Sequence, residues 1–319
     1  MLSRKALVER AIQFKNPDRA PVWSLGSRIG LSDILTYDFS LADQNNPNLS
    51  EWGFRRLRKQ EGGWAIPKEP VLPDWRQVDA YHVPQLDWRR RLSRIEQARK
   101  VCGDRYRLAR LGLSGYAIYS ALRGSVLAGE DFLRDTDRFL EFMMTIMDFE
   151  NSMFEMIARM GFHGVEFTDN WRPAPDSRMT LSLWRRVMAE LYAKQIRLAR
   201  DQKLQVWFSL SMEDVDFFGD LYEMGAHVIR IDKPSEMEVA QIGRNLHGRI
   251  CFATRVDELY NPKDPEGSAR LIRNVYECLG ALTGGFIATV SANADVETLE
   301  GIHRVAQSFR GLPADDSDM

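Results

Sequence analysis

The sequence predicts an α/β protein of the (β/α)8 TIM-type barrel class, and its second half supplies the main observations. From residue 162 to residue 290, short runs rich in β-branched and aromatic residues alternate with helical stretches. Polar residues gather where each short run ends. Strand, polar tip and helix in repeating order is typical of a parallel α/β barrel, which presents polar side chains at the carboxyl ends of its strands. The runs lie at 164–168, 204–208, 227–231, 249–252 and 285–288.

The first half of the chain adds further strands and outer helices. Residues 3–14 are predicted to form a helix with Ser3 as its N-cap, and Pro17 separates it from a short strand at 20–23. Another strand is expected at 107–111. The other helices are predicted from apolar residues that recur three and four positions apart. They are expected at 92–101, 131–160, 181–202 and 296–309.

The whole of residues 1–313 is predicted to form a single barrel domain, since 319 residues is an ordinary length for one α/β barrel. Residues 38–90 are rich in Pro, Asp and Trp and show no sustained periodicity, so we expect an irregular excursion over the barrel. Residues 314–319 form a short acidic tail that is expected to be disordered.

The charge balance excludes some classes of partner. Lys and Arg total 43 against 45 Asp and Glu, which gives no reason to expect nucleic acid or an anionic membrane as a partner. No signal-peptide core is present, and no apolar run approaches the roughly 20 residues of a membrane span. Cys102, Cys251 and Cys278 are far apart, which fits a reducing compartment. We expect a cytoplasmic protein that binds a small molecule, as a monomer or a homodimer.

Six short motifs occur in an order that covers nearly the whole chain. They are NPDRAPVW at 16–23, EWG at 51–53, EPVLPDWRQVDAYHVP at 69–84, RG at 123–124 followed by DFLRD at 131–135, GFHGVEFTDN at 161–170 and GGFI at 284–287. This order resembles the uroporphyrinogen decarboxylase superfamily, and most closely its methylcobamide methyltransferase-like members. The resemblance implies a (β/α)8 barrel with its site at the carboxyl ends of the strands.

The chain departs from the zinc-using methyltransferases of this superfamily at the position of their metal ligands. Those enzymes carry H-x-C-G after the fourth strand, where this chain has Phe208-Ser209-Leu210-Ser211. Phe and Leu offer no lone pair to a metal, so no zinc is expected. The hydroxyls of Ser209 and Ser211 become candidate substrate contacts. Asn293, where relatives have S-H-N and this chain has S-A-N, is another candidate.

The chain also departs from true uroporphyrinogen decarboxylases. Gly26 and Gly30 stand where those enzymes carry two arginines for substrate carboxylates, and Arg28 between them is a candidate substrate contact. A polyanionic tetrapyrrole needs several fixed cations, so it is not the expected substrate. Residues 32–35 read SDIL, a decarboxylase motif, but they fall far too early in the chain. We interpret this match as chance.

Asp169 and Asn170 follow the strand at 164–168, where relatives carry adjacent carboxylates that face the pocket. Asn170 replaces one titratable group and leaves Asp169 as an acceptor or base, with an amide for orientation. The alternative is that Asp169 caps the following helix. Trp171 is predicted to stack on an aromatic ligand or to pack beneath a loop. Strand alternation places Glu166 on the face opposite to Asp169.

Arg255 and Asp257 follow the strand that begins at Arg249. Asp257 matches the Asp of the superfamily's G-G-I-D turn. A fixed guanidinium at a strand tip suits a carboxylate, phosphate or phenolate on a ligand. An ion pair between Arg255 and Asp257, or with Asp232, is an equal alternative. Asp169, Arg255 and Asp257 are therefore the candidate catalytic residues, and Asp232 a candidate substrate contact.

The resemblance implies methyl transfer from a small methylated compound to a corrinoid. The chain has no D-x-H-x-x-G motif for cobalamin, so a partner corrinoid protein would supply it, and no covalently bound cofactor is expected. In this hypothesis Asp169 or Arg255 protonates or polarises the leaving heteroatom. Two alternatives stay open. One is a cofactor-free decarboxylase, a lyase, acting on a small aromatic or heterocyclic acid, and the other is a non-catalytic ligand-binding barrel.

Overall fold

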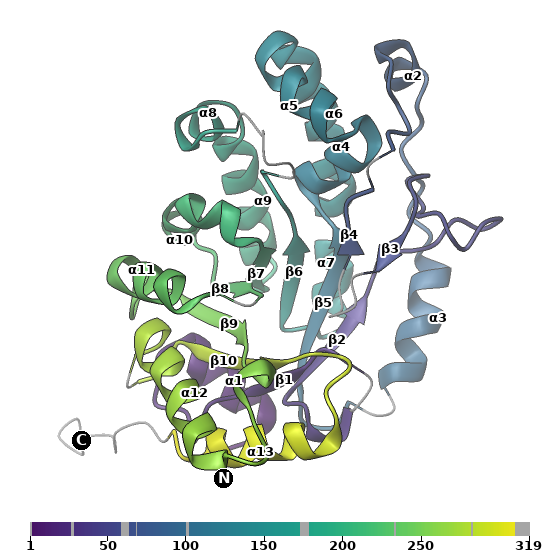
Figure 1. The fold of residues 1–319 in the computed structure, drawn as a ribbon. Helices are drawn as coiled ribbons and strands as arrows, with labels where there is room; N and C mark the ends of the chain where they lie inside the picture. The colour runs from purple at the N-terminus through teal and green to yellow at the C-terminus, as the bar shows by residue number, and fades with distance from the viewer. Residues whose placement is uncertain are drawn as a thin grey trace.

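A computed structural model of the chain describes residues 2–26, 29–58, 64–67, 69–99, 102–172, 179–232, 234–281 and 283–309. Eight parallel strands form a nearly closed barrel with helices around the outside (Figure 1), which confirms the predicted (β/α)8 class. The hydrogen-bonded order is β1-β10-β9-β8-β7-β6-β5-β2. The barrel strands are β1 (Val22–Ser24), β2 (Ile34–Asp38), β5 (Tyr106–Leu113), β6 (Gly164–Thr168), β7 (Gln205–Leu210), β8 (Val228–Ile231), β9 (Cys251–Arg255) and β10 (Phe286–Val290).

Side chains help to close the barrel between β1 and β2, the two ends of the hydrogen-bonded order. Asp33 N donates to Val22 O, and Asp33 Oδ2 accepts from Val22 N, both at 2.8 Å. Arg19 holds the same carboxylate through two bonds of 2.7 Å. Ser32 Oγ accepts from Ser24 N at 3.1 Å. The Ser32-Asp33 pair, interpreted from the sequence as part of a chance match, thus joins the first two strands, and β2 itself was not predicted.

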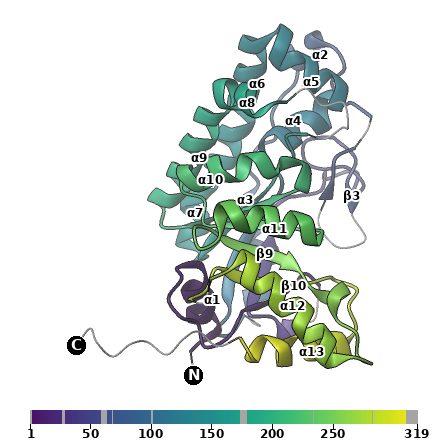
Figure 2. The same ribbon diagram turned by 60° about the vertical axis from the view of Figure 1, so that its left-hand side comes forward.

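The outer helices follow one another around the barrel, as the two ribbon views show (Figures 1 and 2). Two long helices predicted from the sequence are broken. The stretch 131–160 falls in three helices. The backbone leaves the helical region at Asp135 (φ −132°, ψ 49°), and a turn at Ser152 and Met153 separates the second helix from the third. The stretch 181–202 is interrupted at Met188 (φ −113°). Apart from α2 (Trp75–Asp79) and α3 (Trp88–Arg99), the α-helices of the described residues are α1 (Arg4–Ile12), α4 (Gly115–Arg123), α5 (Ser125–Arg134), α6 (Thr136–Asn151), α7 (Phe154–Arg159), α8 (Leu181–Val187), α9 (Ala189–Asp201), α10 (Phe218–Met224), α11 (Glu236–Leu246), α12 (Pro265–Leu279) and α13 (Val296–Gln307).

The excursion at 38–90 contains short regular elements. Strands β3 (Leu57–Arg58) and β4 (Trp64–Ala65) pair antiparallel, and helix α2 (Trp75–Asp79) begins with a capping box at Asp74. Helix α3 (Trp88–Arg99) then leads back to the barrel. The predicted tail at 314–319 lies outside the described residues. Within the described ranges, none of the helices combines the length and the apolar character that a membrane span requires.

Aromatic and aliphatic side chains fill the barrel interior at its amino-terminal end. The rings of Trp23 and Trp207 meet edge to face, with centroids 5.7 Å apart. Trp207 Nε1 donates to the hydroxyl of Tyr106 at 3.3 Å. Cys251 and Ile287 belong to the same buried cluster. Because alternate residues of a strand share one face, the next inward positions of each strand lie above this cluster, toward the carboxyl ends.

Candidate functional site

Polar side chains occupy those next inward positions at the carboxyl ends of the strands. We call this group the barrel mouth. Its members are Arg110, Glu166, Ser209, Arg230, Asp232, Arg255, Asp257 and Thr289.

Glu166 links two arginines across the barrel mouth. Its side chain is fully buried, and its two carboxylate oxygens lie 2.6 Å from Arg110 Nε and 3.1 Å from Arg230 Nε. Arg230 also donates to Asp232 Oδ1 at 2.9 Å and to Ser209 Oγ at 2.5 Å. Charge-assisted bonds of this kind hold side chains in one geometry. The network therefore presents a rigid polar surface.

The aromatic cluster below supports the two arginines. The guanidinium carbons of Arg110 and Arg230 each lie 5.8 Å from the ring centroid of Trp23, within the range of a cation–π contact. Burial alone would lower the pKa of Arg110, but the carboxylates of Glu166, Asp38 and Asp232 outweigh it and raise that pKa. Arg110 therefore stays protonated across the physiological pH range.

Arg255 has unused hydrogen-bonding capacity at the barrel mouth. Its side chain is 3% exposed, its Nε lies 3.4 Å from Asp257 Oδ1, and its Nη2 donates to Glu258. Nε and Nη1 make no hydrogen bond to any described residue. Thr289, the register partner of Arg255 on β10, also has a buried hydroxyl without a described partner. Buried donors left unpaired are costly, so this arrangement suits a site that a ligand completes.

Asp169 lies on the opposite face of β6 from Glu166 and does not join the barrel mouth. Its Oδ1 accepts from the amides of Ala117 at 2.7 Å and Asn170 at 2.8 Å. Its Oδ2 accepts from the amide of Tyr116 at 3.3 Å and from the hydroxyl of Tyr192. Asp169 thus caps α4, which precedes it in the chain, rather than the following helix. Its predicted role as a base gains no support from this placement.

The surroundings of Asp169 are tightly packed and acidic. A Cβ at Gly115, whose φ is +48°, would lie 2.7 Å from both Asp169 Oδ2 and the Tyr192 hydroxyl, so only glycine fits. Burial raises the pKa of Asp169 to about 6, that of Asp214 to about 7 and that of Glu150 to about 8. The charge of Asp169 raises the pKa of the other two carboxyls further. We call Glu150, Asp169 and Asp214 the outer acidic cluster.

Several predicted substrate contacts are engaged near this outer acidic cluster. Trp171 Nε1 donates to the Tyr192 hydroxyl at 2.9 Å, and Ser211 Oγ donates to Asp214 at 3.3 Å. Asn170 Oδ1 accepts from the amide of Arg172 at 2.9 Å. The Trp171 ring packs against other buried aromatic rings, so the predicted packing role fits it better than ligand stacking.

The two remaining predicted contacts are Asn293 and Arg28. Asn293 is exposed in the loop between β10 and α13. Arg28 lies outside the described residues. Of the residues chosen from the sequence, the structure brings Arg255, Asp257, Asp232 and Ser209 together, each at the end of a neighbouring strand among β7, β8 and β9.

Sequence reasoning missed Arg110, Arg230 and Thr289. The signal for each was strand alternation, because Arg110 shares its inward face with Tyr106, and Arg230 shares its face with Val228. A polar residue inside a strand is easily taken for part of the buried core. Polar residues that directly follow a strand are the ones usually selected as site candidates. Glu166 was predicted to lie on the face opposite to Asp169, with the choice between the barrel interior and the outer helices left open, and it was not selected as a site residue.

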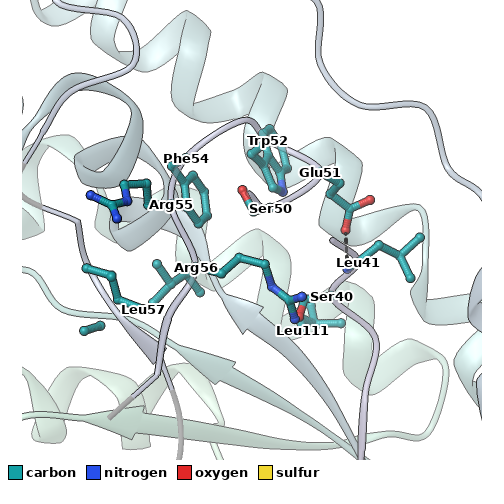
Figure 3. A pocket seen from close by; sticks show the side chains of 12 residues that line it. Ser40, Leu41, Ser50, Glu51, Trp52, Phe54, Arg55, Arg56, Leu57 and Leu111 are labelled. Atoms are coloured by element: carbon teal, nitrogen blue, oxygen red, sulfur yellow. Dashed lines mark hydrogen bonds between the residues drawn. The ribbon is translucent and has the colours of Figure 1, made fainter. Parts of the chain in front are cut away.

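A separate small cavity lies outside the barrel wall, between β5 and the excursion (Figure 3). Leu111, Trp52, Phe54 and Ser50 contribute to its lining, and Glu51 accepts from the amide of Leu41 at 3.0 Å. Its volume of about 20 Å³ has room for about one water molecule, which is too little for a substrate. Across the described ranges, no three His, Cys, Asp or Glu side chains converge as a metal site would require.

Comparisons with known proteins support the fold. No family model matches the chain, and no curated protein matches its sequence. Among solved structures, a methyltransferase from Methanosarcina mazei is similar with a TM-score of 0.64 and 11% identity, over 97% of this chain and 99% of that one. At that identity the likeness shows a shared fold. The protein is therefore a (β/α)8 barrel with a buried polar site at the carboxyl ends of its strands.

Two further structures resemble the chain more distantly. A D-psicose 3-epimerase has a TM-score of 0.41 and 10% identity, over 91% of this chain and 96% of that one. The GH18 chitinase ChiB from Flavobacterium johnsoniae has a TM-score of 0.44 and 11% identity, over 90% and 94%. Both TM-scores are too low to support an argument about this chain.

Proposed function

We propose that the protein is an enzyme that removes a methyl group from a small methylated compound bound at the barrel mouth. The observation that carries this proposal is the buried Arg255 guanidinium, whose Nε and Nη1 have no described hydrogen-bond partner. The sequence resemblance to methylcobamide methyltransferase-like proteins favours methyl transfer over other reactions. The fold shared with the Methanosarcina mazei methyltransferase is compatible with that choice.

In the proposed reaction, the bond between the methyl carbon and its heteroatom breaks, and the electron pair stays on the heteroatom. Arg255 donates an N–H bond to that atom and stabilises the charge that develops there. Thr289 lies beside Arg255 in the strand register and can donate a second bond. The Arg110–Glu166–Arg230 network keeps the surrounding surface fixed, so positioning contributes to the rate as well.

A corrinoid held by a partner protein would supply the acceptor for the methyl group. The described histidines next to barrel strands, His163 and His227, precede β6 and β8 and therefore lie at the amino-terminal end of the barrel. The strand tips of the barrel mouth carry carboxylates, arginines and hydroxyls instead. This donor set suits a substrate and not the cobalt ion, which agrees with a corrinoid held elsewhere. Asp232 and Glu258, with side chains 32% and 53% exposed, place the rim of the mouth within reach of a partner.

The test is an assay of the purified protein with reduced free cobalamin and a panel of O-, N- and S-methylated compounds, both neutral and anionic. Methylation of the corrinoid is followed by its absorbance. We expect turnover of at least one compound and a loss of roughly 100-fold in kcat for Arg255→Lys, the size seen when a transition-state donor is removed. Arg270→Lys, on the exposed face of α12, is the matched control and should change nothing.

The alternatives give different results in the same assay. Release of carbon dioxide from an acid, without corrinoid methylation, would identify a decarboxylase. Tight binding of compounds without any turnover would identify a ligand-binding barrel. Equal kcat for the parent and for Arg255→Lys would remove Arg255 from the chemical step.

A further inference from the structure

The barrel mouth has a second arginine with unused capacity, directly across the barrel from the first. Arg110 lies on β5 and Arg255 on β9, and these strands are four places apart in the eight-strand order. In a closed barrel of eight strands, that spacing puts them on opposite walls. Arg110 Nη2 is buried and has no described hydrogen-bond partner, like Nη1 of Arg255. A ligand that accepts hydrogen bonds from both arginines needs an acceptor group at each of its ends.

The buried charges of the barrel mouth do not cancel. Three arginine side chains, Arg110, Arg230 and Arg255, are 12%, 4% and 3% exposed. Two carboxylates, Glu166 and Asp257, are 0% and 9% exposed. Three positive charges against two negative charges leave one positive charge in excess.

The other carboxylates of the mouth lie nearer to solvent. The side chains of Asp232 and Glu258 are 32% and 53% exposed, and Asp38, the register partner of Arg110 on β2, is half-buried, so water screens these charges. The buried excess of one positive charge therefore remains for a ligand to neutralise, because an uncompensated buried charge is costly.

We propose that the substrate is a small methylated carboxylic acid, with its carboxylate held by Arg110 and its methylated heteroatom at Arg255. This inference rests on the proposed function and adds the substrate class. One negative charge on the ligand matches the buried excess, and a guanidinium with a free Nη suits a carboxylate oxygen. Glu166 already fixes Arg110 through its Nε at 2.6 Å, so Arg110 is held in place before the ligand arrives. Arg110 is then a binding residue, and Arg255 acts on the reacting atom.

Binding of simple probes tests the inference without relying on turnover. 3-Methoxypropionate and 3-methoxypropionamide differ in the carboxylate alone, and ligand-observed NMR titration gives the Kd of each for the intact protein. We expect the acid to bind about tenfold or more tightly than the amide, since a contact to a charged group contributes roughly that factor. Arg110→Met should bring the ratio of the two Kd values to about 1. Arg107→Met, on the outward face of the same strand, should leave the ratio unchanged.

A second variant guards against misfolding, because Arg110→Met removes one partner of Glu166. Arg110→Gln keeps an N–H donor toward Glu166 but carries no charge, and it should show the same ratio of about 1. The inference is overturned if the parent binds acid and amide equally, or if both variants keep the parent's preference for the acid. Failure of the methylation assay with every compound, with this preference intact, would overturn the proposed function and leave the carboxylate site standing.

Discussion

Glu166 is buried between Arg110 and Arg230, and each of its two oxygens pairs with one of them. The pairing confines two guanidinium groups with a single carboxylate, so the loss of that carboxylate leaves Arg110 without its ion-pair partner and Arg230 with Asp232 alone. Breaking a buried ion pair on one side costs about 3–5 kcal/mol. We predict that Glu166→Gln lowers the free energy of unfolding by that amount, as measured by urea denaturation.

A control for this substitution lies on α12. Glu277 is exposed there, and Glu277→Gln should change the free energy of unfolding by less than about 0.5 kcal/mol. A Glu166→Gln protein as stable as the parent would show that the two arginines find other partners in the folded chain. The network would then not hold Arg110 in position.

His163 and His227, which lie just before β6 and β8, each accept a backbone N–H bond from the preceding barrel strand, which requires a neutral Nδ1. His163 accepts from Arg107 N at 2.9 Å and His227 from Val206 N at 3.0 Å. Burial, followed by nearby positive charges, lowers the pKa of each to about 4. An unfolded histidine protonates near pH 6.5, so the folded state loses stability as the pH falls from about 6.5 to about 4. Above pH 6.5 this contribution is fully present.

The comparison that isolates this effect uses the double variant His163→Asn with His227→Asn, whose amides accept a bond but do not titrate. Between pH 6.5 and 4, we expect the parent to lose about 1–3 kcal/mol per histidine relative to the variant, as measured by urea unfolding at each pH. The raised pKa values of the outer acidic cluster affect both proteins alike. Parallel stability curves for the two proteins would contradict the prediction.

At the residue scale, polar residues that follow a strand were predicted better than polar residues inside a strand. Asp232, Arg255 and Asp257 follow or end strands, and the structure finds all three at the barrel mouth. Asp169 also follows a strand, yet its side chain turns to the opposite face, as simple alternation with Glu166 indicates. Which of two faces a tip residue takes depends on the exact end of its strand, and sequence patterns locate that end least well.

Helix α4 begins where three elements converge on buried carboxylates. Asp169 accepts the amides of Tyr116 and Ala117, and Glu150 on α6 lies 3.3 Å from the amide of Gly115. These are unpaired first-turn amides of a helix, which an acceptor side chain satisfies. The outer acidic cluster is therefore an anchor for α4 and links it to β6 and α6.

Asp169→Asn tests this anchoring role. The amide keeps one acceptor oxygen where the carboxylate uses two, so part of the contact to Tyr192 or to the α4 amides is lost. We predict a loss of about 1–3 kcal/mol in the free energy of unfolding, as measured by urea denaturation. At a temperature where the variant is fully folded, kcat in the methylation assay should stay within about twofold of the parent's. A variant as stable as the parent but without turnover would restore Asp169 as the catalytic base.

Elements differ in how well the sequence predicts them. Strands β6 to β10 have apolar runs with clear boundaries and were predicted within a few residues. Strand β2 was not predicted, because a run of five residues beside an irregular segment is too short to show a clear periodicity. Its strand conformation depends on pairing with β5 in the folded barrel. The long predicted helices have breaks at Asp135, at Ser152 and Met153, and at Met188 that were not predicted, since apolar periodicity continues across these positions.

For the whole molecule, the joint between β1 and β2 decides whether the barrel is a closed ring. Asp33 links Val22 to Arg19 across this joint and is 1% exposed. Asp33→Ala removes the acceptor of the Val22 amide and leaves the Arg19 guanidinium without its bidentate partner. We predict a loss of about 3–5 kcal/mol in the free energy of unfolding, with one cooperative transition, because a barrel shares a single core.

Circular dichroism and tryptophan fluorescence, followed through urea unfolding, measure this effect. The two transitions should coincide in the parent and in Asp33→Ala. Asp18→Ala is the nearby control, because the Asp18 carboxylate is exposed and accepts the amide of Leu2 at 3.0 Å. Separate transitions by the two probes in Asp33→Ala would mean that the barrel can open at the joint without unfolding.

The class of fold followed from the sequence because strand and helix alternate over most of the chain, and the structure confirms it. The closure of the barrel did not follow. It depends on Ser32 and Asp33, two side chains whose partners, Ser24 and Val22, are on the first strand. Patterns over a few neighbouring residues cannot predict such a pairing. For the same reason they cannot predict that Arg110 and Arg255 lie on opposite walls of the barrel mouth.

The joint between β1 and β2 also shows where the gene could be rearranged. Each of the other seven joints carries a parallel ladder of main-chain bonds. This joint, within the described residues, rests on Asp33 N to Val22 O and on the side chains around it. A circular permutant that starts just before β2 and finishes with α1 and β1 would keep every ladder. It would place the new chain ends between β1 and β2, the pair of adjacent strands that lacks a ladder of main-chain hydrogen bonds in the described part of the chain.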